Sequence, residues 1–285
     1  MIRLDAATVL LQWATGGLLF LWVTTRRREV GIGYGWLLRA VYAVLALGAA
    51  AAGRVVDAEP VRDICALGVV AAATVSLVVS VARRKAGVAG ERDRKARKAT
   101  RVAAMAGRPA ALDAPDVETT VREFPPALDL VAPVIGLVGL VAAGIAAGDP
   151  HALAVARTLA GALFLGAVTD AMLLGHWYLV QPGLGRGPLL ELNRWLALTW
   201  PVEVALLLWP TGMLSVLSGT VDDGWNGTLG WFWVACAIAT VVLTAVTRAA
   251  LREKAYSAVM AATGLLYLAI LTAFGTDLVA RAVLA

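Results

Sequence analysis

Long apolar runs, separated by short polar segments, recur along the whole chain. Each run is about 18 residues long or longer, which is the length that a helix needs to cross the hydrocarbon core of a bilayer. We therefore predict an all-α fold, a polytopic integral membrane helix bundle with eight transmembrane helices. The predicted spans are residues 6–25, 33–53, 63–82, 128–148, 152–180, 191–217, 229–247 and 255–281.

One long connection divides the predicted spans into two groups. Residues 1–82 hold the first three spans, residues 83–127 form the loop, and residues 128–285 hold the other five. The first part of the loop is a basic, helix-forming run, and its later part is broken by prolines. We expect a cytoplasmic juxtamembrane segment attracted to anionic lipid head groups, with a docking site for a cytoplasmic partner as the alternative.

Charges alternate between successive connections. The odd-numbered connections are basic, beginning with Arg26, Arg27 and Arg28, whereas acids match or outnumber bases in the even-numbered ones. Because basic loops stay in the cytoplasm, we predict a multi-pass cell-membrane protein with cytoplasmic basic loops and both termini on the outer side.

A weak internal similarity suggests a repeat. Residues 18–41 align with residues 173–196, and the alignment matches a tryptophan with a tryptophan and Arg39 with Arg194. Two parallel four-helix halves would explain this similarity, and chance resemblance between apolar segments is the alternative. Such a plan is similar, in architecture alone, to quinol-interacting anchor subunits of the polysulfide-reductase type.

Composition narrows the chemistry. The chain is 60% hydrophobic with a net charge of +5, and the charge lies in the connections, so we predict no nucleic-acid partner. Two cysteines and two histidines do not form a recognisable metal site, although a haem held by His176 and a non-histidine ligand stays open. No phosphate-binding loop or nucleophile motif supports catalysis on a phosphate or an ester.

Three ionisable residues inside predicted spans are the main functional candidates. Asp170 and His176 lie in the fifth span, and Glu203 follows Pro201 in the sixth. A charge at the bilayer centre costs about 2.5–3.5 kcal/mol, so such residues usually face the bundle interior. Asp170 and Glu203 are equally distant from the turn between their spans, and we expect them at similar depth. If they lie close together, one must hold a proton; a purely structural bond to a hydroxyl or an arginine is the alternative.

Aromatic residues extend this candidate site. Trp177 and Tyr178 follow His176 directly, and these three residues could bind a ligand or form an interfacial aromatic belt. Arg194 is near enough to the inner interface to join the site or to snorkel, and we expect Arg39 to snorkel in the same way.

Other charged residues at span ends have simpler explanations. We expect Asp129 to be a helix cap or an interfacial acid. Asp277 and Arg281 are four residues apart, which predicts an ordinary i,i+4 pair near the outer interface.

These patterns predict a non-catalytic membrane subunit, or a partner of a redox or other membrane assembly. Its buried polar cluster would bind a quinone-like or lipid-like ligand or handle protons. The expected partners are membrane lipids and other membrane subunits, and a quinone is the candidate cofactor. A small proton-coupled transporter is the alternative, and a stand-alone membrane enzyme is the third hypothesis. The candidate site residues are Asp170, His176, Trp177, Tyr178, Arg194 and Glu203.

Overall fold

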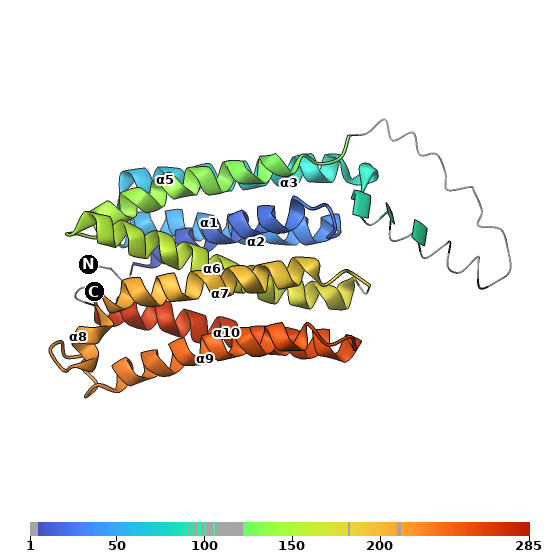
Figure 1. Ribbon diagram of the computed structural model, residues 1–285. Coiled ribbons are helices and arrows are strands. Elements are labelled where there is room, and N and C mark those ends of the chain that lie inside the picture. The colour runs from blue at the N-terminus through green and yellow to red at the C-terminus, as the bar shows by residue number, and fades with distance from the viewer. Residues whose placement is uncertain are drawn as a thin grey trace.

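The computed structural model is a bundle of long helices (Figure 1). It describes residues 5–90, 92–93, 96–97, 100, 105, 122–181, 183–209 and 212–285, and within these residues there is no strand. The long helices are α1 (Ala6–Thr25), α2 (Ile32–Val55), α3 (Pro60–Ala82), α5 (Val131–Ala146), α6 (His151–Val180), α7 (Gly187–Leu208), α9 (Thr228–Ala250) and α10 (Tyr256–Val283). The short elements are η1 (Arg84–Ala86), η2 (Pro126–Leu130) and α8 (Met213–Leu217).

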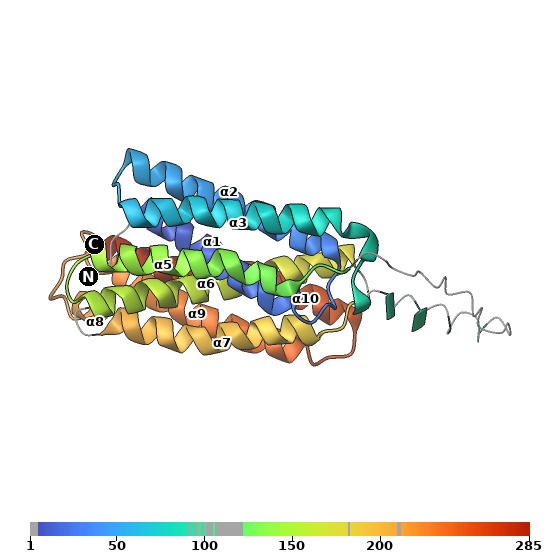
Figure 2. The ribbon, with the colours of Figure 1, turned by 90° about the horizontal axis from the view of Figure 1, so that it is seen from above.

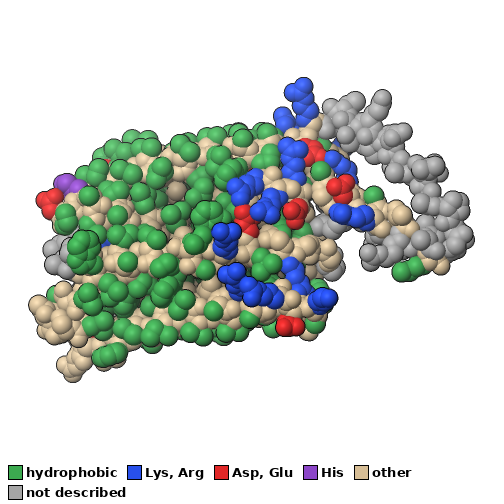
Figure 3. Space-filling model, in the orientation of Figure 1, with side chains coloured by type: hydrophobic (Ala, Val, Ile, Leu, Met, Phe, Trp, Pro, Cys, Tyr) green, Lys and Arg blue, Asp and Glu red, His purple; other side chains and the backbone are tan. Residues whose placement is uncertain are grey.

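Seven of these segments are long and apolar enough to cross a membrane: α1, α2, α3, η2 with α5, α6, α9 and α10. Hydrophobic side chains cover much of the flank of the bundle (Figure 3). Large apolar side chains such as Val78 and Leu271 are more than half exposed there, as expected for helices that face lipid. The chain therefore has the features of a multi-pass membrane protein, and the predicted all-α membrane bundle is confirmed at that level.

Helix α7 is the exception among the long helices. It lies alongside α6 (Figures 1 and 2), but it carries Glu191, Arg194 and Glu203 and is not among the seven apolar segments. The predicted count of eight spans is thus not confirmed, and α7 as a span stays a prediction.

The predicted sixth span, residues 191–217, is wrong as a single helix. Helix α7 ends at Leu208, the backbone of Trp209 is extended, and α8 begins only at Met213. At Gly212 a Cβ atom would lie 1.9 Å from the carbonyl oxygen of Leu207, so Gly212 lies tightly against the end of α7. Residues 210 and 211, which connect α7 to α8, lie outside the described residues.

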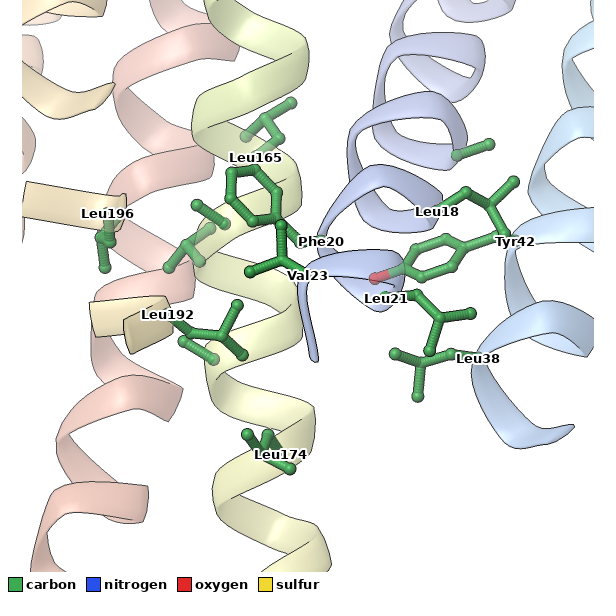
Figure 4. Close-up of a cluster of buried hydrophobic side chains, with 14 of the residues drawn as sticks. Leu18, Phe20, Leu21, Val23, Leu38, Tyr42, Leu165, Leu174, Leu192 and Leu196 are labelled. Carbon is green, nitrogen blue, oxygen red and sulfur yellow. The ribbon is translucent and has the colours of Figure 1, made fainter. Parts of the chain in front are cut away.

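Helix α6 occupies the centre of the bundle and packs against α1, α5, α7 and α10. Its backbone touches that of α1, because a Cβ atom on Gly16 would lie 1.8 Å from the carbonyl oxygen of Ala162 and one on Gly166 would lie 2.6 Å from that of Gly16. Small residues permit such close approach of membrane helices. Around this contact, leucine and phenylalanine side chains of α1, α2, α6 and α7 form the apolar core (Figure 4).

The two ends of the bundle differ in charge. Both termini lie at one end (Figure 1), which we call the terminal end. Lysine and arginine side chains gather at the other end (Figure 3), which we call the basic end. Most of the predicted loop, residues 83–127, lies outside the described residues. The side of the membrane that each end faces stays a prediction.

The predicted repeat also stays a prediction. Of the two matched arginines, Arg39 is buried whereas Arg194 is exposed, so the alignment does not place them in equivalent surroundings.

Candidate functional site

The carboxyl group of Asp170 is fully buried between α6 and α2. It accepts a hydrogen bond from the hydroxyl of Tyr42 through Oδ1, and the hydroxyl of Tyr34 lies 3.4 Å from the backbone carbonyl oxygen of Asp170. Its other carboxyl oxygen, Oδ2, has no hydrogen-bond partner among the described residues. We call these three residues the Asp170 cluster.

The sequence of α2 explains how this cluster connects to the basic end. Gly35, Arg39 and Tyr42 follow one another at i, i+4 and i+7, which places them on one face of the helix. Gly35 and Arg39 line a small cavity at the basic end, and Tyr42 lies one turn deeper. On α1, Gly17 leaves room for the ring of Tyr42, because a Cβ atom there would lie 2.0 Å from its Cζ atom.

The carboxyl group of Glu203 belongs to a second buried group of charges. It interacts electrostatically with Asp277 and Arg281 of α10 and with Arg157 of α6, and Glu203 and Asp277 have no exposed surface. Within the described chain, neither carboxyl oxygen of Glu203 accepts a hydrogen bond from an N–H or O–H group. We call Glu203, Asp277, Arg281 and Arg157 the Glu203 cluster.

Both arginines of the Glu203 cluster have defined partners. Arg281 Nε lies 2.7 Å from Asp277 Oδ2, and Arg157 donates to the carbonyl oxygens of Leu206 at 2.8 Å and Trp209 at 3.2 Å. Since Leu206 and Trp209 lie where α7 ends, Arg157 satisfies carbonyl groups that have no helical partner.

A glycine makes the Glu203 cluster possible. A Cβ atom on Gly161 of α6 would lie 2.7 Å from Gln12 Nε2, 2.9 Å from Asp277 Oδ1 and 3.1 Å from Arg281 Nη2. Gln12, which is fully buried, donates to the carbonyl oxygen of Thr158 at 2.6 Å. The polar groups of α1, α6 and α10 therefore converge on the space that the missing side chain leaves.

Asp170 and Glu203 both face the protein interior, as predicted, but they do not meet. Asp170 is nine residues beyond Gly161, or about 13 Å along α6, whereas the Glu203 cluster lies at the level of Gly161. The expectation of similar depth is therefore wrong. It relied on equal distances from the turn, but the register between two packed helices depends on their contacts and on the path of the turn.

Two expectations about charged residues at span ends are also wrong. Arg39 does not snorkel, because it is 2% exposed and forms a bidentate ion pair with Asp129, each bond being 2.8 Å long. Asp129 is equally buried and accepts a third bond from Thr25 Oγ1 at 3.0 Å, so it is neither an interfacial acid nor a simple cap. Asp277 and Arg281 do form the predicted i,i+4 pair, and both side chains are buried.

The three aromatic residues of the predicted site, His176, Trp177 and Tyr178, lie in different surroundings. His176 is exposed on the flank, where its Nδ1 atom lies 3.2 Å from the hydroxyl of Tyr267 on α10. Trp177 Nε1 donates to Gln181 Oε1 at 2.9 Å and its ring packs against Tyr34. Tyr178 is buried and its hydroxyl donates to the carbonyl oxygen of Gly185.

Arg194 is exposed on α7. Of the six candidates, the structure thus places Asp170 and Glu203 in two separate buried clusters, Tyr178 and Trp177 at the basic end of α6, and His176 and Arg194 on exposed surfaces. It does not bring them together into one site.

Sequence reasoning missed several members of these clusters. The signal for Arg157 and Gln12 was present, since each is a strongly polar residue inside an apolar run. Tyr42 gave no such signal, because a tyrosine in a membrane span is common. Among the described residues, no group of three or more His, Cys, Asp and Glu side chains could hold a metal ion.

Each end of the bundle has a small cavity. The cavity at the terminal end has a volume of about 90 Å³ and is lined by Asp5, Asp57, Glu59, Arg62, Thr158 and Arg281, among others. The cavity at the basic end has a volume of about 40 Å³ and includes Arg28, Arg39 and Glu123 in its wall. Arg281 thus links the Glu203 cluster to one cavity, and the Arg39 face of α2 links the Asp170 cluster to the other.

Comparison with known proteins found no matching family model, no matching curated protein and no matching solved structure. The class that the fold and the clusters define is therefore a multi-pass helical membrane protein with two buried polar clusters, and its function must be inferred from the geometry of these clusters.

Proposed function

We propose that this protein is a non-catalytic membrane subunit, or a partner of a larger membrane assembly, that handles protons at carboxyl groups inside the bundle. In this proposal α7 is an eighth span, the basic end is cytoplasmic and the termini lie outside. The alternation of charge between the connections supports that orientation.

The observation that carries the proposal is the position of Glu203. Its carboxyl group has no exposed surface and receives no N–H or O–H bond from the described residues, while the neighbouring carboxyl group belongs to Asp277. Two carboxyl groups can hydrogen-bond to each other only when one carries a proton. Burial of an ionised carboxylate without donors is so costly that the group neutralises instead. The Glu203–Asp277 pair is therefore suited to hold a proton and exchange it.

Infrared spectroscopy of the protein in lipid nanodiscs tests this proposal. A protonated carboxyl group gives a C=O band distinct from that of a carboxylate, and we expect this band at neutral pH, with its loss or reduction in Glu203→Gln. The matched control is Glu253→Gln, an exposed acid at the basic end, which should leave the band intact. A wild-type protein without the band at neutral pH would remove the basis for proton handling.

The partner in the proposal requires a separate experiment. Purification of the native protein in mild detergent, followed by identification of co-purifying proteins, should recover a stable membrane assembly. Recovery of the folded chain without any co-purifying protein would favour the transporter described next.

A small proton-coupled transporter is the second candidate, and the paired cavities favour it. Arg281 of the Glu203 cluster lines the cavity at the terminal end, and Tyr42 of the Asp170 cluster lies one turn of α2 from Arg39, which lines the cavity at the basic end. Between the clusters the backbones of α1 and α6 touch at Gly16 and Gly166. This is the arrangement expected of an occluded state with a dry barrier. Proton flux into liposomes containing a pH-sensitive dye, abolished by Asp170→Asn, would support transport.

A quinone-like or lipid-like ligand remains part of the proposal at the flank. The exposed His176 offers a ring that packs edge to face with Tyr267, with ring centres 6.3 Å apart. His176→Phe keeps the size of the side chain but removes its polar groups, so it should weaken binding of a quinone analogue while leaving the carboxyl band of the preceding experiment unchanged.

A further inference from the structure

The wall of the cavity at the basic end includes an arginine, Arg39, with hydrogen-bond donors that no described residue accepts. The side chain of Arg39 is 2% exposed, and its Nε and Nη2 atoms bind Asp129. Its third nitrogen, Nη1, is buried and has no hydrogen-bond partner among the residues that the structure describes. A guanidinium group has five N–H donors, so this edge of Arg39 can bind a further acceptor.

The free edge of Arg39 lies at the start of α2. Side chains on a helix lean toward its N-terminus, and here the Nη1 atom of Arg39 lies 2.7 Å from the position of a Cβ atom on Gly35. Both residues line the cavity, together with Gly31 and Ile32 at the first turn of α2. The absence of a side chain at position 35 is therefore what allows the guanidinium group to reach this cavity.

The first turn of α2 adds further donors. No side chain caps this 24-residue helix at Gly31. Among the described residues, the N–H group of Gly31 binds Gln181 Oε1 at 3.0 Å and that of Tyr34 binds the carbonyl oxygen of Gly31 at 3.1 Å, which leaves the N–H groups of Ile32 and Gly33. The N–H groups at a helix start and the helix dipole together favour an anion.

The charges around the cavity also favour an anion. Arg28 lines it and binds Glu123 Oε2 at 3.2 Å, while Arg83 and Arg92 bind other atoms of Glu123. Of the charged residues that line the cavity, Arg28 and Arg39 are positive and Glu123 is negative, which leaves an excess of one positive charge in its wall.

We propose that this cavity binds a phosphate group, either that of an anionic phospholipid or free phosphate. Arg39 Nη1, Arg28 and the first turn of α2 would supply the donors. The cavity volume of about 40 Å³ is room for about three water molecules, which is comparable with one phosphate group. The cavity lies at the basic end of an apolar bundle (Figure 3), where phospholipid head groups would be available. This site is independent of the proton-handling proposal.

Thermal unfolding in nanodiscs, followed by tryptophan fluorescence, tests the site. One arm adds inorganic phosphate to nanodiscs of phosphatidylcholine, and the other replaces part of the phosphatidylcholine with phosphatidylglycerol. A ligand that binds only the folded protein raises its melting temperature. We expect a rise in at least one arm: a rise with phosphate identifies free phosphate as sufficient, and a rise with phosphatidylglycerol alone identifies the lipid.

Two variants distinguish a built site from general surface charge. Arg28→Gln should weaken the apparent affinity at least about tenfold. Its matched control is Arg27→Gln, since Arg27 is as exposed as Arg28, at 45% against 48%, and also pairs with a glutamate, but does not line the cavity. Gly35→Ala keeps every charge and should abolish the stabilisation by displacing Arg39. Equal losses of apparent affinity in Arg27→Gln and Arg28→Gln would overturn the proposal. No rise in the melting temperature of the wild type in either arm would also overturn it.

Discussion

The Arg39–Asp129 pair and the Glu203 cluster are both buried groups of charges, but they differ in how their atoms are satisfied. Asp129 accepts three bonds from Arg39 and Thr25, and the guanidinium group of Arg39 lies 4.3 Å from the centre of the Phe124 ring. Glu203, by contrast, receives no hydrogen bond from an N–H or O–H group in the described chain.

This difference separates two uses of buried charge. A fully paired acid holds helices together, here α1, α2 and the segment that leads into α5. An acid without donors adds no comparable stabilisation, and in the proposed function it is this acid that exchanges a proton. Substitutions at the Arg39–Asp129 pair should therefore reduce stability more than function, whereas substitutions at Glu203 should reduce function more than stability.

The largest effect on stability should follow from breaking the Arg39–Asp129 pair. Arg39→Leu leaves Asp129 charged and buried, and removal of one partner of a buried pair costs about 3–5 kcal/mol. The double variant with Asp129→Leu should recover most of this loss, because neither charge remains. Unfolding in mixed micelles measures both variants. A single variant as stable as the wild type would contradict the structural role.

Gly161 should rank second, because the Glu203 cluster depends on the space beside it. Gly161→Ala places a Cβ atom against Gln12, Asp277 and Arg281, and overpacking of this kind costs about 1–3 kcal/mol. The matched control is Gly264→Ala in α10, where a Cβ atom would meet no other atom within 4 Å. That control should be neutral or stabilise by up to about 1 kcal/mol. Equal effects of the two substitutions on unfolding would show that the space is not required.

The long helices could be predicted from sequence because a long apolar run in lipid must satisfy its backbone internally. The burial of Asp170 and Glu203 followed from the same reasoning, since a charge facing acyl chains is too costly. Their partners could not be predicted. Helix rotation and register depend on contacts such as that between Gly16 and Gly166, which are distant in sequence and carry no polar signal. Likewise, nothing local to Arg39 indicated that Asp129, 90 residues away, would bind it.

A smaller effect on stability is expected at Glu203 itself. Glu203→Gln removes a buried acid that receives no donor bond and introduces an amide that can donate to Asp277, so unfolding should change by less than about 1 kcal/mol. Asp277→Asn is the contrasting variant, because it weakens the pair with Arg281, and it should destabilise more. A loss at Glu203 as large as that at Arg39 would erase the distinction between the two regions.

The smallest effect should come from Asp223, a half-buried acid in the loop before α9 that lies outside the membrane-spanning helices. Its Oδ1 accepts bonds from the N–H groups of Trp225 and Gly227, and its Oδ2 from those of Leu229 and Gly230. Desolvation acts to raise the pKa of Asp223, but the four backbone bonds together outweigh it, and the pKa is lowered overall.

The sign of the pH dependence follows from this lowered pKa. The bonds of Asp223 contribute stability above the usual aspartate pKa of about 3.9, and this contribution is lost as the pH falls through the lower pKa of the folded protein. The difference in melting temperature between the wild type and Asp223→Asn should therefore be present at neutral pH and shrink in acid. Asp222→Asn removes the neighbouring acid, which has one backbone bond, to Gly224, and should show a smaller difference. Unlike the two buried groups of charges, the carboxylate of Asp223 is held by backbone donors alone. A difference in melting temperature between the wild type and Asp223→Asn that stays constant from neutral pH into acid would show that the charge of Asp223 does not stabilise the start of α9.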